Sequence, residues 1–395
     1  MTSRARWANI WLRTHLALIA SLLLSSAASA SWQMKEFPIL YSSGWPAEAV
    51  SERMTQQLAL QIAASHYNTV MCEPSELELV AKAGLRCLVI GRSQGGPDWI
   101  GEAVSPSVVH GLASEPAVWG YYVTDEPDNK NWRRGTTFQQ LAGRIKDYRS
   151  ADPNHLAWIN VTSATGSLLS DYMEVVRPDF LSFDLYRWWA KESDWWRGLE
   201  AHRNAALMAH VPMIMWIESN SSEKRFNAHL PPPEGNEAKL RWSVYTSLAY
   251  GSKGVQWFLG TTNGDVAQIN AELSALGPTL IHLESKHVFH TSKVPLEGLP
   301  LPQGGWYFTD AQDLVVGEFE KPGDSHASYF LIANKSIDHE TDAVFEFRRP
   351  VSALEEVSKQ SADRTALPMD RRAAATYVRL HLAAGDGRLI RVEAK

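Results

Sequence analysis

The sequence predicts an eight-fold β/α (TIM) barrel followed by a C-terminal antiparallel β-sandwich domain. From residue 37 to about residue 260, eight short apolar runs alternate with amphipathic helical stretches, as in a closed parallel sheet. After about residue 290, short alternating or β-branched runs are separated by Gly, Pro, Asp and Asn, which is typical of antiparallel strands. An open doubly wound sheet is the competing fold, but its glycine-rich phosphate turn is missing after the first strand.

The predicted barrel strands are rich in β-branched and aromatic residues. They cover residues 37–41, 67–71, 85–90, 118–123, 156–161, 180–186, 211–217 and 255–259. Helical periodicity separates them and is clearest at residues 51–65, 138–148 and 237–250. A last helix at about 266–283 is expected to complete the barrel.

The C-terminal strands are predicted at residues 314–320, 328–334, 343–347, 354–357, 375–382 and 388–392. The proline-rich stretch 294–305 is the expected linker between the domains. The predicted organisation is therefore a signal peptide at 1–30, a barrel at 31–290 and a sandwich at 291–395.

The first thirty residues have the pattern of a secretory signal peptide. Three arginines precede an apolar run at residues 16–24, and the small residues Ala28-Ser29-Ala30 follow. The run is short for a membrane span, and no cysteine stands directly after it to carry a lipid. Cleavage after Ala30 would give a periplasmic or secreted protein without a membrane anchor, and an uncleaved anchor is the alternative.

Composition narrows the range of partners. The net charge of −6 argues against nucleic acid or an anionic membrane as the main partner. The 16 tryptophans are many for 395 residues, and indole rings either stack on sugars or pack in large cores. No metal and no cofactor is expected, because the scattered histidines and two cysteines lack the spacing of metal ligands.

The two cysteines, Cys72 and Cys87, are expected to be buried free thiols. Cys72 lies near the end of one predicted strand and Cys87 near the start of the next parallel one. This arrangement separates them by roughly 10 Å along the strand axis, beyond the reach of a disulfide. In an oxidising compartment, pairing is the alternative.

The fourth predicted strand stops at two adjacent carboxylates and a proline, Asp125-Glu126-Pro127. Proline cannot donate to a sheet ladder, so strand pairing should end there and the chain should turn. Because side chains alternate along a strand, one carboxylate is expected to reach into a site while the other braces it. A polar strand-to-loop junction without a function is the simpler interpretation.

The carboxyl ends of the predicted strands gather polar and aromatic residues at one mouth, the face where such barrels hold their chemistry. Glu126 and Glu218 lie on nearly opposite sides of it and form the predicted catalytic pair. Glycoside hydrolysis requires one carboxyl to protonate the leaving oxygen, another to attack or to activate water, and surfaces on which sugars stack. The predicted substrate-binding residues are Tyr41, Glu73, Arg92, Asp125, Asn160, Asp184, Tyr186, Trp188, Trp216 and Trp257.

Several of these residues also have structural explanations. Asp184 and Tyr186 can satisfy backbone groups at a strand end, and Arg92 can form an ion pair with Glu73. Trp216 shares the facing of the catalytic carboxylate of its strand, so it either lines the mouth or packs inside the barrel. Two aromatic pairs suit a sugar platform or helix packing equally well, namely Trp188-Trp189 and Trp195-Trp196.

Three stretches resemble the glycoside hydrolases of clan A: residues 120–127 (GYYVTDEP), 215–218 (MWIE) and 251–258 (GSKGVQWF). Such enzymes often carry a C-terminal β-sandwich, and residues 384–390 resemble its closing hairpin. The resemblance implies a retaining mechanism. In it, Glu126 is the acid/base, Glu218 is the nucleophile, Tyr186 orients the nucleophile, and Trp257 forms the floor beneath the sugar.

Asp125 departs from the pattern, because clan members usually have an asparagine before the acid/base. An adjacent Asp-Glu pair on strand four is similar to the substrate-assisted hexosaminidases, which orient the substrate's acetamido group with the Asp and have no enzyme nucleophile. Glu218 at the nucleophile position favours double displacement. The sequence thus predicts an exported glycoside hydrolase acting on an oligo- or polysaccharide, with a non-catalytic carbohydrate-binding barrel of the cell envelope as the third possibility.

Overall fold

The computed structural model describes residues 32–42, 54–91, 102–128, 137–162, 167–188, 191–219, 236–258, 260–262, 264–372 and 375–395. The chain divides into two compact units, Met1–Gln33 and Met34–Lys395. The predicted signal peptide at 1–30 lies outside the described residues. The second unit contains a closed barrel and two antiparallel sheets, which confirms the predicted fold class.

Eight parallel strands follow one another around the barrel in sequence order, and β1 closes it by pairing with β8. Each strand overlaps a run that the sequence predicts, because buried parallel strands are apolar along their whole length. The strands are β1 (Ile39–Tyr41), β2 (Thr69–Cys72), β3 (Arg86–Val89), β4 (Val118–Asp125), β5 (Leu156–Thr162), β6 (Leu181–Asp184), β7 (Met213–Glu218) and β8 (Ser252–Phe258).

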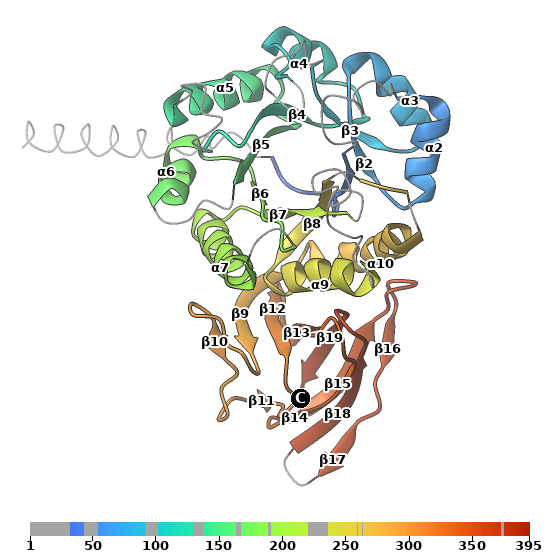
Figure 1. The fold of residues 1–395 in the computed structure, drawn as a ribbon, viewed down its shortest axis with the longest axis vertical. Coiled ribbons are helices and arrows are strands. Elements are labelled where there is room, and N and C mark those ends of the chain that lie inside the picture. The colour runs from blue at the N-terminus through green and yellow to red at the C-terminus, as the bar shows by residue number, and fades with distance from the viewer. Residues whose placement is uncertain are drawn as a thin grey trace, which may run out of the picture. The chain divides into compact units, whose positions relative to one another are not determined.

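Helices lie around the strands (Figure 1). Their starts follow local capping chemistry: the Thr137 hydroxyl accepts from the backbone N–H of Gln140, whose side chain in turn accepts from the N–H of Thr137. The described helices are α2 (Gln56–Ala64), η1 (Pro74–Glu76), α3 (Leu77–Lys82), α4 (Pro106–Leu112), α5 (Phe138–Ala151), α6 (Ser167–Val176), α7 (Glu192–Ala209), α9 (Asn236–Ala249) and α10 (Gly264–Leu280). None of the helices in the described ranges combines the length and the apolar character that a membrane crossing requires.

The prediction of two free thiols is wrong. Cys72 and Cys87 form a disulfide with Cα atoms 5.8 Å apart. The register of β2 and β3 places Val70 opposite Cys87 and Val89 opposite Cys72, so the cysteines are two positions apart on adjacent strands. Each strand has only four residues, fewer than the sequence suggested. The end of β2 and the start of β3 are therefore close along the strand axis, and the two cysteines lie within bridging distance.

Two antiparallel sheets follow the barrel. The seven-stranded sheet has the order β10-β9-β12-β13-β19-β15-β16, and the four-stranded sheet has the order β11-β14-β18-β17. The strands are β9 (Glu284–His290), β10 (Leu299–Pro300), β11 (Tyr307–Phe308), β12 (Leu314–Lys321), β13 (Asp324–Asn334), β14 (Thr341–Phe347), β15 (Val351–Val357), β16 (Arg364–Ala366), β17 (Asp370–Arg372), β18 (Ala375–Leu382) and β19 (Gly387–Ala394).

Two details of the sandwich differ from the sequence prediction. β9 pairs with β12. The seven-stranded sheet therefore begins before residue 290, the position at which the sequence predicted the boundary between barrel and sandwich. Residues 384–390 do not form a hairpin, since β18 belongs to the four-stranded sheet and β19 to the seven-stranded sheet. Sequence patterns mark strands but not their partners, which depend on how the two sheets pack.

The central strands of the seven-stranded sheet, β12, β13 and β19, are buried on both faces. Val316 and Ile390 face the four-stranded sheet, whereas Val315 and Leu389 belong to the same apolar cluster as the barrel helices. Helix α9 packs on β12, β13 and β19. A Cβ atom on Gly317 would lie 2.1 Å from the carbonyl oxygen of Ala249, the last residue of α9. The sandwich therefore packs against the barrel by close backbone contact.

Candidate active site

Asp125 faces the barrel mouth because β4 contains a bulge. Tyr122 pairs with Trp158 but Thr124 pairs with Ile159, so Val123 is an extra residue relative to β5. An extra residue shifts the alternation of side chains by one position. Asp125 then stands opposite Asn160 and points the same way.

Glu126 reaches the same site through an unusual backbone conformation. Its φ of 42° lies in the left-handed region that non-glycine residues rarely adopt. Its backbone N–H donates to the carbonyl oxygen of Asn160 at 2.8 Å, and the charge of its carboxylate helps to raise the pKa of the Asp184 carboxyl. Asp125 and Glu126 thus both enter the mouth, whereas the sequence predicted that one would reach into the site while the other braces it.

Asn160 holds two carboxylates in place. Its amide Nδ2 donates to Asp125 Oδ1 at 3.0 Å and to Asp184 Oδ1 at 3.2 Å. Its Oδ1 accepts from the hydroxyl of Ser182 at 2.8 Å. Asn160 is 3% exposed, so all of these bonds are shielded from water and β4, β5 and β6 are tied together at the mouth.

A buried chain of hydrogen bonds fixes the orientation of Asn160. The indole N–H of Trp158 donates to Gln256 Oε1 at 3.0 Å, and Gln256 Nε2 donates to Ser182 Oγ at 2.7 Å. Because Ser182 accepts from Gln256, its own proton is directed to the Asn160 oxygen. The amide nitrogen of Asn160 must therefore face the two aspartates.

Glu218 ends β7 inside the mouth and is 2% exposed. Its Oε1 accepts a hydrogen bond of 2.8 Å from the backbone N–H of Trp188, in the loop between β6 and α7. A backbone donor fixes the direction of the carboxylate without adding a side-chain charge. The loop after β6 therefore orients the predicted nucleophile.

Tyr186 lies among these acids, with its ring stacked on Phe258 at a centroid distance of 5.0 Å. Burial raises the pKa of its phenol well above the ordinary value, and the charges of four nearby carboxylates raise it further. Those carboxylates are Asp184, Asp125, Glu126 and Glu218. The phenol is thus protonated and able to donate to a carboxylate or a substrate oxygen.

Burial and the charges of Glu126 and Asp125 also raise the pKa of the Asp184 carboxyl well above its usual range. Three strand ends therefore bring together carboxylates that compete for protons. Within the part of the chain that the structure describes, no His, Cys, Asp or Glu side chains form a group of three suited to a metal ion.

Aromatic rings fill the barrel beneath the mouth. Tyr122 stacks on Trp158 at 5.4 Å, and Trp158 meets Trp216 edge-on at 6.0 Å. Trp216 is 1% exposed, and its indole N–H has no hydrogen-bond partner among the described residues. Trp216 thus packs inside the barrel. Sequence reasoning missed Tyr122 and Trp158, although both lie at inward-facing positions of their strands.

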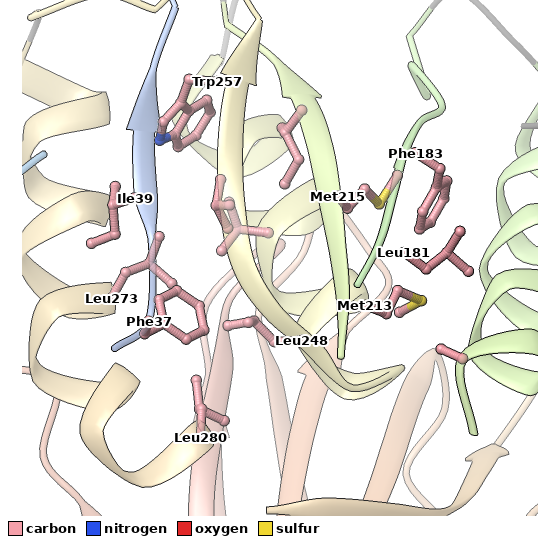
Figure 2. Packing of buried hydrophobic residues seen from close by; sticks show 14 of the residues in the cluster. Phe37, Ile39, Leu181, Phe183, Met213, Met215, Leu248, Trp257, Leu273 and Leu280 are labelled. Carbon is pink, nitrogen blue, oxygen red and sulfur yellow. The ribbon is translucent and has the colours of Figure 1, made fainter. Parts of the chain in front are cut away.

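The expected role of Trp257 as the sugar floor does not agree with its position. It is fully buried and its indole N–H donates to Asn270 Oδ1 of α10 at 2.8 Å. Figure 2 shows it beside β1, above Ile39 and Leu273, which belong to the same buried apolar cluster. The adjacent residue Gln256 points into the barrel instead. Because neighbouring side chains of a strand point in opposite directions, the prediction assigned the wrong one of these two residues to the mouth.

Trp188 is not an open stacking platform. The Arg187 guanidinium lies 4.9 Å and the Lys239 ammonium 5.0 Å from the centre of its ring, and Trp242 lies 5.8 Å from it. Its contribution to the site is its backbone N–H. Trp195 and Trp196 are buried and pack on Trp242, which confirms helix packing rather than a sugar platform for that pair.

The remaining predicted residues lie at the rim or outside the described chain. Tyr41 is half-buried and meets Tyr67 edge-on at 5.2 Å. Glu73 stands at the start of η1, where its backbone N–H donates to Glu76 Oε2 at 2.8 Å. Arg92 lies outside the described residues.

A hollow of about 580 Å³ lies away from the mouth, between α9, α10 and two sandwich loops. All of its charged lining residues are engaged in ion pairs with one another: Arg241 with Glu237, Glu272 and Asp386, and Lys359 with Glu272 and Asp386. Its charges are therefore explained by the contact between the domains.

No protein-family model and no curated protein matches this sequence. Solved structures are similar in fold. A GH27 β-L-arabinopyranosidase from Geobacillus stearothermophilus has a TM-score of 0.52 at 10% identity, covering 91% of this chain and 96% of that chain. A family 39 glycoside hydrolase from Bacteroides cellulosilyticus has a TM-score of 0.46 at 12% identity, covering 91% and 81%. A GH30 xylanase C catalytic domain from Talaromyces cellulolyticus has a TM-score of 0.43 at 8% identity, covering 92% and 98%.

The likeness to the arabinopyranosidase covers nearly all of both chains and includes the region after the barrel. At 10% identity it concerns the fold. The predicted resemblance to barrel glycoside hydrolases is thereby confirmed at the level of fold, and the chemistry must be argued from the site.

Proposed function

We propose that this chain is an exported glycoside hydrolase that cleaves glycosidic bonds of an oligo- or polysaccharide. The observation that carries the proposal is that carboxylates from the ends of β4, β6 and β7 are held at one mouth: Asn160 bridges Asp125 and Asp184, and the N–H of Trp188 holds Glu218. Paired carboxyl groups at the carboxyl ends of barrel strands are what acid-assisted displacement at a sugar carbon requires. The fold shared with known glycosidases agrees with this assignment.

The mechanism we propose is retaining double displacement. Glu126 protonates the leaving glycosidic oxygen while Glu218 attacks the anomeric carbon; Glu126 then takes a proton from the water that displaces Glu218. The backbone N–H of Trp188 supports the role of Glu218, because it holds one oxygen and leaves the carboxylate fixed in direction. We assign Tyr186 the role of donor to that carboxylate or to the substrate, because its phenol is protonated and lies near Glu218.

Hydrolysis of a panel of aryl glycosides tests the activity. Glu126→Gln should lower kcat by about 10²–10⁴-fold on substrates with poor leaving groups, and Glu218→Gln should abolish turnover, with melting temperature and circular dichroism unchanged. A wild-type protein that binds glycans but cleaves no member of the panel would instead identify a non-catalytic carbohydrate-binding barrel.

Azide separates the roles of the two glutamates. With Glu218→Ala, azide should restore turnover and give a glycosyl azide of inverted configuration, because it attacks from the face that the nucleophile leaves open. With Glu126→Ala, the azide product should retain its configuration. Wild-type-like activity of Glu218→Gln would eliminate double displacement.

A substrate-assisted mechanism is the second candidate, and the bulge at Val123 favours it by turning Asp125 into the site. In that mechanism Asp125 would orient an acetamido group and Glu126 would act as acid/base. It requires that only sugars with a 2-acetamido group are cleaved, that Asp125→Ala is severely impaired, and that Glu218→Gln stays active. The comparison of Asp125→Ala with Glu218→Gln decides between the two mechanisms.

Export is supported by the Cys72–Cys87 disulfide, because such bonds persist mainly in oxidising compartments. We infer cleavage after Ala30 and release into the periplasm or medium. The intact mass of the protein from its producing cells should match a chain starting at Ser31 with no free thiol after denaturation. A mass that includes residues 1–30 would support an uncleaved anchor instead.

A further inference from the structure

The backbone at Glu126 adopts a conformation that its local sequence disfavours. Its φ of 42° lies in the left-handed region, where the Cβ atom of an L-residue crowds the following carbonyl oxygen. The next residue is Pro127, and a residue that precedes proline favours extended backbone. A conformation of this kind persists only where the surrounding structure fixes it. Contacts with other parts of the chain must therefore hold Glu126.

Two contacts with β5 hold the turn that contains Glu126 and Pro127. At its start, the backbone N–H of Glu126 donates to the carbonyl oxygen of Asn160 at 2.8 Å. At its end, Asp128 Oδ1 accepts from the backbone N–H of Thr162 at 2.9 Å, and Asp128 Oδ2 accepts from the hydroxyl of the same threonine at 2.6 Å. The turn is thus fastened on both sides of Pro127.

The contact between Asp128 and Thr162 is well suited to hold the turn. Asp128 is 5% exposed, so water competes little for its hydrogen bonds, and bonds to a carboxylate are stronger than those between neutral groups. Thr162 is itself fixed, because it ends β5 and lies opposite Asp184 of β6. Asp128 therefore ties the chain after β4 to a rigid part of the barrel.

We propose that Asp128 is a positioning residue for the acid/base: by binding Thr162 it holds the turn after β4, so that Glu126 keeps its left-handed backbone and its carboxyl stays at the mouth. This inference rests on the proposed glycosidase function. It adds a residue that the sequence did not single out, and Asp128 acts through Glu126. The simpler role for Asp128 is to satisfy the end of β5 without any effect on the chemistry.

The dependence of rate on the leaving group tests the proposal. Asp128→Ala removes both contacts with Thr162, so Glu126 should lose its alignment with the glycosidic oxygen. On aryl glycosides with poor leaving groups, kcat/KM should fall by about 10²-fold, the cost of a displacement of about 1 Å. On dinitrophenyl glycosides it should fall far less, because that leaving group needs little proton donation. An equal fall on both kinds of substrate would overturn the proposal, since a merely structural role impairs them alike.

Two milder variants keep part of the contact. In Asp128→Asn, the amide oxygen can accept from the Thr162 N–H while the amide nitrogen donates to the Thr162 hydroxyl. This variant should recover most of the activity on poor leaving groups that Asp128→Ala loses. Thr162→Val removes only the hydroxyl and should give a smaller effect in the same direction. If Asp128→Asn were as impaired as Asp128→Ala, the charge rather than the two contacts would matter, and the proposal would be wrong.

A matched control is Asp179→Ala. Asp179 is also a buried aspartate, but it pairs with Arg149 at 2.6 Å and precedes β6, at the end of the strands opposite to the mouth. Its replacement should lower the melting temperature and leave the dependence on the leaving group unchanged. A dependence that steepened as much as in Asp128→Ala would trace the effect to general loosening of the fold and contradict the role of Asp128.

A stability measurement needs no substrate. Glycine is favoured over alanine in a left-handed conformation, whereas elsewhere alanine is favoured because it loses less conformational entropy. Glu126→Gly should therefore unfold at a higher urea concentration than Glu126→Ala. When Asp128→Ala is also present, the turn can relax, and this advantage of glycine should shrink or reverse. The same advantage in both backgrounds would show that Asp128 does not hold Glu126.

The kinetic and the stability measurements separate this inference from the proposed function. If the advantage of glycine depends on Asp128 but the wild-type protein cleaves no glycoside, the proposed function fails and the hold of Asp128 on Glu126 stands. If glycosides are cleaved but neither the leaving-group dependence nor the advantage of glycine changes in Asp128→Ala, the function stands and this inference fails.

Discussion

Three side chains from the ends of β4, β5 and β6 lie near one another at the barrel mouth: Glu126, Asn160 and Asp184. Glu126 has a left-handed backbone, its charge helps to raise the pKa of Asp184, and Asn160 bridges Asp184 to Asp125. Asn160 thus joins carboxylates of β4 and β6, whereas the sequence singled out the pair on β4 and β7. Such a bridge depends on contact between side chains, which spacing along a chain does not reveal.

Asn160→Ala should affect stability and activity together. It removes the donor to two carboxylates and leaves the buried Ser182 hydroxyl without its acceptor. The free energy of unfolding should fall by about 1–3 kcal/mol, and kcat should fall with it because Asp184 is no longer held. Urea unfolding and steady-state kinetics measure the two effects.

A control for this prediction lies in the same network. Ser182→Ala leaves the two donor bonds of Asn160 intact, so it should cost stability with a smaller loss of kcat. If Ser182→Ala and Asn160→Ala lowered kcat equally, the contact of Asn160 with the acids would not be what matters. The double variant should show coupling, since the two residues share a hydrogen bond.

At the scale of elements, one inserted residue reorganises the site. The bulge at Val123 reverses the facing of Asp125 relative to a regular strand. Strand existence was predictable from apolar runs, since all eight barrel strands overlap their predicted ranges. The direction in which side chains point at the strand ends was not predictable. A bulge depends on the pairing of β4 with β5 and leaves no pattern in a single sequence.

Gly317→Ala should weaken the packing of β12 on α9. The added methyl would stand 2.1 Å from the carbonyl oxygen of Ala249 and 2.8 Å from the ring of Phe319, so the backbone has to move. We expect a loss of about 1–3 kcal/mol in the free energy of unfolding. Gly304→Ala is the control, because no atom lies within 4 Å of its added Cβ. Equal stability of Gly317→Ala and the wild type would contradict the close packing.

For the whole molecule, two buried histidines set part of the response to acid. Burial lowers the pKa of His202 to about 4, and burial together with the charge of Lys335 lowers the pKa of His290 to about 3. Both are neutral in the folded protein, while in the unfolded chain they bind protons below about pH 6.5. Their contribution to stability is complete above that pH and is lost as pH falls toward 4.

Between pH 7.5 and pH 5, the free energy of unfolding should therefore fall, with each histidine contributing about 1 kcal/mol per pH unit below 6.5. His290→Gln can still accept the hydrogen bond that joins Tyr250 and His290 but cannot titrate. Its stability should change less between these pH values than that of the wild type, as calorimetry would measure. An equal pH dependence in both proteins would show that His290 is not buried neutral.

By itself, the sequence determined the order of strands and helices, the change from a parallel barrel to an antiparallel sandwich, and the carboxylates at the ends of β4, β6 and β7. These follow from local patterns of apolar and turn-forming residues. The tertiary structure alone decided the disulfide, the outward position of Trp257, the facing of Asp125 and the bridging of Asp125 and Asp184 by Asn160. Each of these depends on register between neighbouring strands, and a shift of one residue in register reverses which side chains meet.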